Sequence, residues 1–194
     1  MRKPPVSFLA LFAATLLSAC GGGGGGNLAS YAAGFAALQG DTTLATPSLD
    51  STVDARNAPA TYNGFINIGT DPVGSPYGRH AYYGGISMTV NFSSATTDDA
   101  VTGTANDFVL YATFDRASPQ TGSAVPGSLT LSGNLTGDNS FTEGIAATAT
   151  GSIDGVSVAY DVDGTINGVG ANGMSLGFDG TNAESSGGVA LLVE

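Results

Sequence analysis

From residue 60 to the end of the chain, apolar and polar residues alternate with a period of two. Ile86 to Phe92, Val156 to Val162 and Met174 to Phe178 are clear examples. Because successive side chains of a β-strand point to opposite faces, each such stretch predicts a strand with one buried and one solvated face. The other predicted strands lie at 62–68, 108–114, 128–132, 141–151 and 189–193.

Turn residues separate these stretches. Asp154-Gly155 and Asn172-Gly173 supply the positive φ angles that hairpins need, and 30 of the 194 residues are glycine. About eight strands with mostly short connections predict an all-β fold, a single eight-stranded antiparallel up-and-down β-barrel without exposed edges. Such a barrel is filled by side chains or holds one small ligand. A membrane-spanning barrel, the alternative, would turn its apolar face outward.

The first residues have the pattern of a secretory signal. Arg2 and Lys3 precede an apolar run, Val6 to Leu17, which is shorter than the roughly 20 residues that span a bilayer. The next residues, Leu17-Ser18-Ala19-Cys20, resemble the lipobox of bacterial lipoproteins. That resemblance implies a signal peptide over 1–19 and a lipidated Cys20, the only cysteine. An ordinary signal with a chance cysteine is the alternative.

Six glycines follow Cys20 and indicate a flexible tether. We expect a lipid-anchored tether and linker over 20–59, with a short helical turn at 31–38, and the barrel domain over 60–194. Stable attachment takes more than one acyl chain, a condition that a triacylated cysteine meets. Gly21, where lipoproteins retained in the inner membrane have Asp, favours the outer membrane.

The charge of the chain limits its partners. After residue 19 it has three arginines, no lysine and 16 acidic residues. Nucleic-acid binding needs Lys and Arg to displace counterions, so we expect no nucleic-acid partner. The same scarcity of basic residues argues against docking on anionic lipid headgroups through a basic patch.

Short motifs along 60–193 resemble the β-barrel domain of transferrin-binding protein B-like surface lipoproteins, a superfamily that includes factor H-binding protein and haemoglobin-haptoglobin utilisation lipoproteins. The motifs are Ala60-Thr61-Tyr62-Asn63-Gly64, Gly85 to Phe92, Gly127 to Leu131, Gly164 to Gly168, Gly177-Phe178-Asp179-Gly180, Asn182-Ala183-Glu184 and Gly187-Gly188-Val189. The resemblance implies a binding protein, often a partner of a TonB-dependent transporter. Larger members have two lobes, whereas this chain has room for one barrel, and no binding residue carries over by motif.

One predicted loop concentrates residue types that favour binding. It contains Tyr77, Arg79, His80, Tyr82 and Tyr83, and Tyr and Arg are enriched at binding hot spots. We take these five as candidate ligand-binding residues. The alternatives are tyrosines that pack on the barrel rim, or a ferric-ion site that also uses Asp71.

Three further patterns point away from catalysis. Gly168 to Gly173 matches a dinucleotide motif but no helix follows it, and Asp161 to Gly164 lacks the other ligands of a calcium loop. His80, the only histidine, has no recognisable nucleophile motif near it in sequence. We expect no enzyme, no cofactor and no metal.

The sequence therefore predicts a lipid-anchored, non-catalytic binding protein on the outer-membrane surface. A structural envelope lipoprotein in the periplasm and a lipocalin-like carrier of a small ligand are the alternatives.

Overall fold

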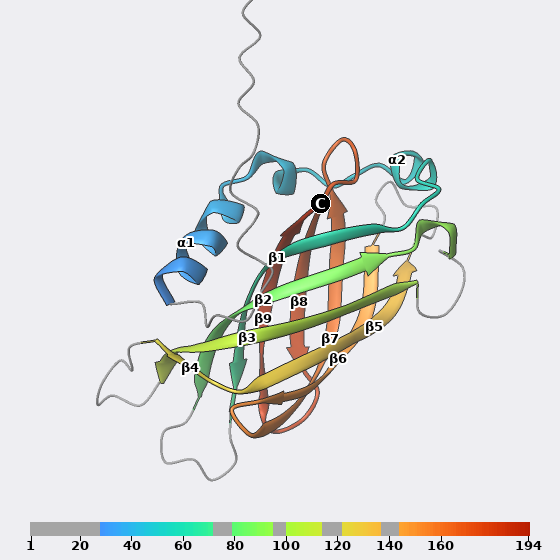
Figure 1. Cartoon of the computed structure of the whole chain (residues 1–194). Coiled ribbons are helices and arrows are strands. Elements are labelled where there is room, and N and C mark those ends of the chain that lie inside the picture. The colour runs from blue at the N-terminus through green and yellow to red at the C-terminus, as the bar shows by residue number, and fades with distance from the viewer. Residues whose placement is uncertain (1–27, 72–78, 95–99, 114–121, 137–143) are drawn as a thin grey trace, which may run out of the picture.

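The computed structural model describes residues 28–71, 79–94, 100–113, 122–136 and 144–194. Cys20 and Tyr77 lie outside these ranges. The described residues form eight long strands that close into one barrel (Figure 1). These strands are β1 (Ala60–Thr70), β2 (His80–Val90), β3 (Val101–Thr113), β5 (Gly127–Thr136), β6 (Gly144–Ile153), β7 (Val156–Asn167), β8 (Gly173–Gly180) and β9 (Ser185–Val193).

The topology is the simplest that a barrel can have. Each long strand pairs antiparallel with the next one in the chain, and β9 pairs back with β1. The predicted all-β, eight-stranded up-and-down barrel is therefore confirmed. The strands begin at Ala60, where the barrel domain was expected to begin.

Alternating side chains fill the interior of the barrel. Along β1 the residues are buried at every second position, and the same rhythm recurs in β7 and β8. The largest fully buried side chains are Tyr62, Tyr82, Tyr160, Phe108, Ile66, Ile68, Met88, Leu129, Leu131, Ile145, Ile153 and Ile166. The apolar set faces inward, as expected for a barrel whose outer wall meets water.

Two local features shape the barrel. Asp154 and Gly155 have φ angles of 53° and 79°, so the predicted Asp-Gly hairpin is confirmed between β6 and β7. Asp107, with φ 54°, lies where the register between β2 and β3 shifts, a bulge that bends its strand. Beyond this bulge β3 leaves β5 and pairs with the short strand β4 (Ser123–Ala124).

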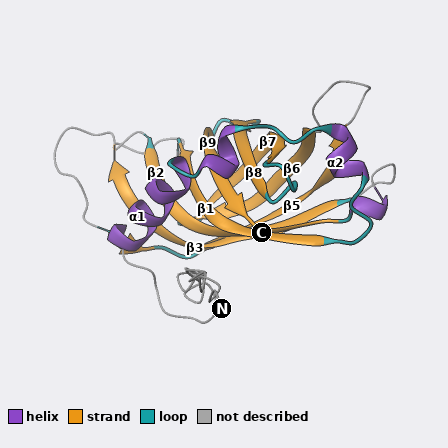
Figure 2. Cartoon of the chain, turned by 90° about the horizontal axis from the view of Figure 1, so that it is seen from above, coloured by secondary structure: helices purple, strands orange, loops and turns teal. Residues whose placement is uncertain are grey.

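Residues 28–59, expected as a linker with a short helical turn at 31–38, fold against the barrel, and the helical turn is confirmed as part of a longer helix. They form helix α1 (Leu28–Gln39), the 3₁₀ helix η1 (Thr42–Ala45) and helix α2 (Asp50–Asp54). A second 3₁₀ helix, η2 (Phe92–Ser94), follows β2. Helix α1 lies beside the outer wall, and α2 lies at the upper end of the barrel (Figures 1 and 2). None of the described helices has the length and hydropathy needed to cross a bilayer.

Aromatic side chains hold α1 against the wall. Tyr31 and Phe35 lie one turn apart, on the same face of the helix. Tyr31 packs edge-on against Phe65 of β1, with ring centroids 5.9 Å apart. Phe35 is buried and lies 5.7 Å from Tyr83 of β2. The helix contains no charged residue and no charge-stabilised end, so these ring contacts supply much of its stability.

We predict that Gly34→Ala destabilises the protein although alanine is the better helix former. A Cβ at Gly34 would overlap the Phe65 ring, so the helix must move off the wall at a cost of about 1 kcal/mol or more. Equilibrium urea unfolding measures the change. Gly40→Ala is the control, because its Cβ would lie 3.6 Å from the Ala37 carbonyl oxygen, an ordinary contact. Equal stabilisation by both substitutions would contradict the packing of α1.

Candidate functional site

The upper end of the barrel is closed by the segment that precedes β1. Val53 of α2 is buried in the same hydrophobic cluster as the barrel interior. Arg56 then extends over the rim, where its guanidinium lies 5.1 Å from the centre of the Phe92 ring. The residues from η1 to Arg56 therefore act as a plug, a name used below for residues 42–56.

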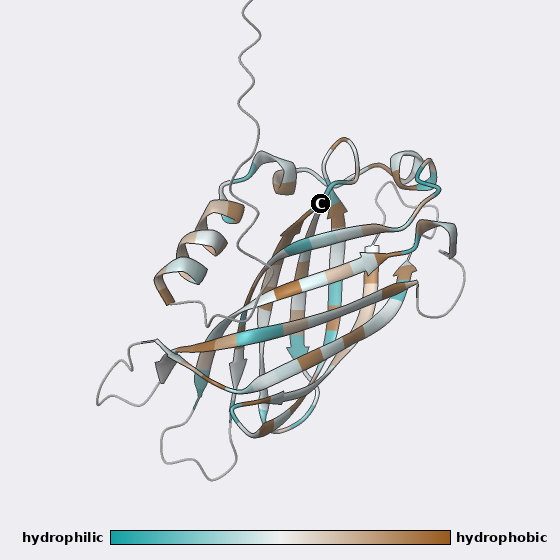
Figure 3. Ribbon diagram, viewed as in Figure 1, coloured by the Kyte–Doolittle hydropathy of each residue, from teal (hydrophilic) through white to brown (hydrophobic). Residues whose placement is uncertain are grey.

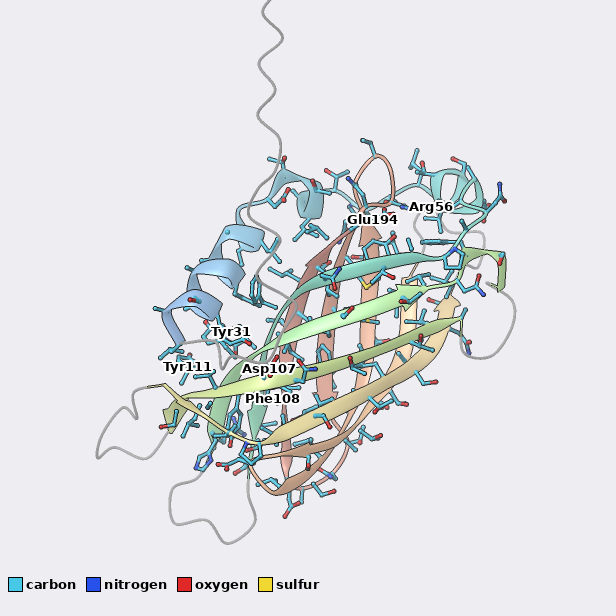
Figure 4. The ribbon with its side chains drawn as sticks, viewed as in Figure 1. Tyr31, Arg56, Asp107, Phe108, Tyr111 and Glu194 are labelled. Atoms are coloured by element: carbon cyan, nitrogen blue, oxygen red, sulfur yellow. The ribbon has the colours of Figure 1, made fainter. Side chains whose placement is uncertain are left out.

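Arg56 ties the plug to the end of the chain (Figure 4). Its Nη2 donates to both carboxylate oxygens of Glu194, at 2.6 and 2.7 Å. Its Nη1 donates to the carbonyls of Gly170 and Ala171, at 3.0 and 2.7 Å. One side chain thus joins the plug, the β7–β8 turn and the last residue.

Buried hydroxyl groups complete this contact. The Tyr62 hydroxyl donates to the Ala171 carbonyl at 2.5 Å, and Ser48 Oγ donates to the Gly168 carbonyl at 2.6 Å. Burial raises the pKa of the Tyr62 phenol to about 12, while Arg56 acts in the opposite direction. The hydrogen bonds of Arg56, Tyr62 and Ser48 thus join the plug to the β7–β8 turn at the upper rim.

The lower end of the barrel holds a second polar cluster, directed inward. Tyr160 donates its hydroxyl to the Gly69 carbonyl at 2.8 Å. A hydrogen bond of 3.1 Å joins Nδ1 of His80 to the hydroxyl of Tyr82. Burial raises the pKa of both Tyr82 and Tyr160 above the usual value for tyrosine. The phenols of Tyr82 and Tyr160 therefore stay protonated at neutral pH, and their hydrogen bonds stabilise the lower end of the core.

The four candidate ligand-binding residues that the structure describes, Arg79, His80, Tyr82 and Tyr83, do not converge on one surface. Tyr82 points inward and has no exposed area, and His80, half-buried, binds it. Tyr83 lies on the outer wall, while Tyr77 lies outside the described residues. The segment from His80 onward is strand β2 rather than loop. Alternation along this strand sends Tyr82 and Tyr83 to opposite faces, a consequence that a loop assignment hides.

Arg79 and Tyr83, the two described candidates that do not point into the barrel, differ in how accessible they are to a partner. Arg79 is largely exposed and lies 3.4 Å from the carboxylate of Asp71. Tyr83 packs on Phe35 and, at 4.9 Å between ring centroids, on Tyr111. Direct contact with a partner through Tyr82 conflicts with its burial, whereas contact through Arg79 remains a prediction.

The outer wall has a shallow concavity that the sequence did not single out. It has a volume of about 420 Å³ and lies over β5, β6 and β7, where its lining includes Asn134, Thr148, Asp161 and Asp163. Asp161 and Asp163 are both exposed on the outer face of β7. Asp161 pairs in register with Asp179 of β8, and like charges in such positions repel.

The described residues also bear on the metal and dinucleotide patterns considered in the sequence. Among the described residues no three His, Cys, Asp or Glu side chains gather as a metal site would require. The Gly168 to Gly173 motif is a turn that leads from β7 into β8, with Val169 at its exposed tip. Comparisons with protein-family models, with curated proteins and with solved structures find no match.

The contact made by Arg56 was the main feature that sequence reasoning missed. The signal that could have suggested it is composition, because Arg56 is one of three arginines after residue 19 and stands just before the first strand. Nothing in the sequence pattern pairs it with Glu194, 138 positions away.

We predict that Arg56→Met lowers the free energy of unfolding by about 2 to 3 kcal/mol, because several charge-assisted hydrogen bonds are lost at once. Glu194→Gln removes only the partly exposed ion pair and costs less than about 1 kcal/mol. Urea unfolding measures both. Arg79→Met is the matched control, with an exposed ion pair and an expected cost near zero. Equal costs at positions 56 and 79 would contradict the role of Arg56.

The buried tyrosines predict alkaline unfolding. In the unfolded chain the tyrosine phenols ionise near pH 10.0, whereas in the folded protein the pKa of the Tyr62 phenol is about 12. Above pH 10 the unfolded state therefore binds fewer protons, and stability falls as the pH rises towards 12. Tyr62 alone accounts for about 3 kcal/mol of this fall.

Tyrosinate absorbance, which no tryptophan obscures, should rise for the accessible tyrosines first and for Tyr62, Tyr82 and Tyr160 only as circular dichroism reports loss of the barrel. Tyr62→Phe should flatten the alkaline fall in stability. Reversible titration of all seven tyrosines near pH 10 in an intact barrel would refute the assignment.

Proposed function

We propose that this protein is a lipid-anchored, non-catalytic binding protein of a bacterial outer membrane, displayed at the cell surface. The observation that carries the proposal is the lipobox-like Leu17-Ser18-Ala19-Cys20 at the end of the apolar run. The lipid attached to Cys20 holds the barrel at the membrane, and the barrel presents its outer wall and rims to a partner.

The packing of the barrel supports a role on its outer surface. Large side chains such as Tyr62, Tyr82 and Phe108 occupy the interior, and the plug covers the upper end. A small ligand inside the barrel would have to displace them, so the filled core disfavours the lipocalin-like carrier. A partner meets the outer wall instead, where the acidic concavity and Arg79 are accessible.

The resemblance to transferrin-binding protein B-like lipoproteins favours a macromolecule as the partner. Proteins of that kind bind macromolecules and work beside a TonB-dependent transporter. We therefore propose a protein partner, such as a nutrient carrier or host protein. The chemistry of the sole histidine agrees with a non-catalytic role, because His80 is engaged with Tyr82 in the lower end of the barrel.

We predict that Cys20→Ser releases the protein from membranes. The hydroxyl of serine cannot form the thioether to diacylglycerol, so the variant loses its acyl chains and their roughly 0.8 kcal/mol per buried methylene. The measurement is fractionation of cells after a carbonate wash, with mass spectrometry of the mature amino terminus. Ser18→Ala, which keeps the cysteine and a small residue before it, is the control. Wild-type protein that carries no lipid would refute the proposal.

Protease treatment of intact cells tests surface display. Surface-displayed protein is degraded without permeabilisation. A barrel that is lipidated but protected until the outer membrane is opened would overturn surface display and favour the structural periplasmic alternative.

A further inference from the structure

Charge is distributed unevenly around the barrel. The sequences of α1, β1 and β9 contain no charged residue. On the long strands of the described barrel, the carboxylates belong to Asp107 of β3, Asp161 and Asp163 of β7, and Asp179 of β8. In the ring of eight strands β7 stands three places from β1 and two from β9. Helix α1 packs on β1, β2, β3 and β9, so the two carboxylates of β7 lie on a different side of the barrel from α1.

The uncharged side is also partly apolar on its surface. The exposed positions of α1 are mostly alanines, among them Ala29, Ala33, Ala36 and Ala37. Beside α1, β9 turns Val189 outward with 46% of its surface exposed, and Leu191 and Val193 are half-buried. Most of α1 is white to brown in Figure 3. We call the outward side chains of α1 and β9 the neutral face.

The lipid anchor would be close to this face. Seven residues separate Cys20 from Leu28, the first residue of α1. Eight backbone steps span at most about 29 Å, so α1 begins within that distance of the acylated cysteine. Leu28 itself lies against Gly122, next to β4 at the lower part of the wall. An attached surface meets the bilayer at high effective concentration, so even weak affinity becomes sufficient.

We propose that the neutral face rests on the bilayer that holds Cys20, with the acidic strand β7 turned away from it. This inference deepens the proposed function and depends on lipidation. Alanine and valine side chains contact the headgroup region without the cost of desolvating a charge. Anionic lipids repel carboxylates near the surface, which disfavours the orientation with β7 against the membrane. The outer-wall concavity then faces a partner rather than lipid.

The test uses the mature lipidated protein in vesicles of phosphatidylcholine and phosphatidylglycerol. Acylation blocks the thiol of Cys20, so an introduced cysteine is the only one that reacts with a fluorophore. Ala33→Cys and Val189→Cys report on the neutral face, Thr148→Cys on the opposite wall and Val169→Cys on the upper rim. A water-soluble quencher is applied to each labelled protein in vesicles and in detergent.

We expect vesicles to reduce quenching several-fold at Ala33→Cys and Val189→Cys and to leave Thr148→Cys unchanged. Equal quenching at all positions, or protection at Val169→Cys or Thr148→Cys alone, overturns the orientation. Protection of the neutral face in detergent that increases with protein concentration indicates a second copy of the chain and also overturns it. Vesicle flotation is measured first, and its failure refutes lipid anchoring itself, a different result from equal quenching in floated protein.

A charge introduced into the face provides an independent check. Ala33→Glu with Ala37→Glu should restore quenching at Val189→Cys in vesicles, because anionic lipids repel the added carboxylates. Thr148→Glu, on the opposite wall, is the matched control. It should leave the quenching at Val189→Cys in vesicles as low as it is without the added charge. Circular dichroism confirms that each variant is folded, and continued protection at Val189→Cys in the folded double variant would count against the proposal.

Discussion

The closure of β9 onto β1 is the constraint on which the rest of the structure depends. This pairing joins residues from opposite ends of the barrel sequence, Asn63 with Val193 and Ile68 with Gly188. It removes the two sheet edges that an open meander would expose, and it defines an inside. Once the ring is closed, alternation along each strand decides which side chains form the core and which meet a partner.

Closure of the ring leaves two open ends, and the chain secures them differently. At the upper end, residues before β1 supply a plug, and Arg56 joins it to Glu194, so both chain ends of the barrel domain meet at one rim. At the lower end, the hydroxyls of Tyr82 and Tyr160 are satisfied from within the barrel. A small all-β domain without a disulfide gains stability from such networks in addition to apolar burial.

Periodicity predicted the barrel because it is a property of each strand alone. The in-and-out pattern of Tyr62 and Ile66, or of Val158 and Tyr160, follows from strand geometry and is independent of where the partner strand lies. The candidate site could not be obtained in this way. The orientation of Tyr82 depended on where β2 begins, and residues rich in Tyr and Gly before Gly85 resembled a loop. Only a helical turn at 31–38 could be predicted for α1. Its full length and its packing could not, because its stability comes from Phe65 and Tyr83, which are distant in sequence.

The same long-range contacts connect the fold to the proposed role. Aromatic side chains on the outer wall of a water-exposed barrel would be a liability, and α1 covers Phe65 and Tyr83 with a helix that brings no charge of its own. The result is one side of the barrel that is neutral and close in sequence to Cys20, and another that carries Asp161 and Asp163. The proposed lipid anchor precedes α1 and would restrain the domain near the neutral side of the barrel. In the proposed arrangement, the packing that stabilises α1 also distinguishes the membrane-facing side of the barrel from the partner-facing side.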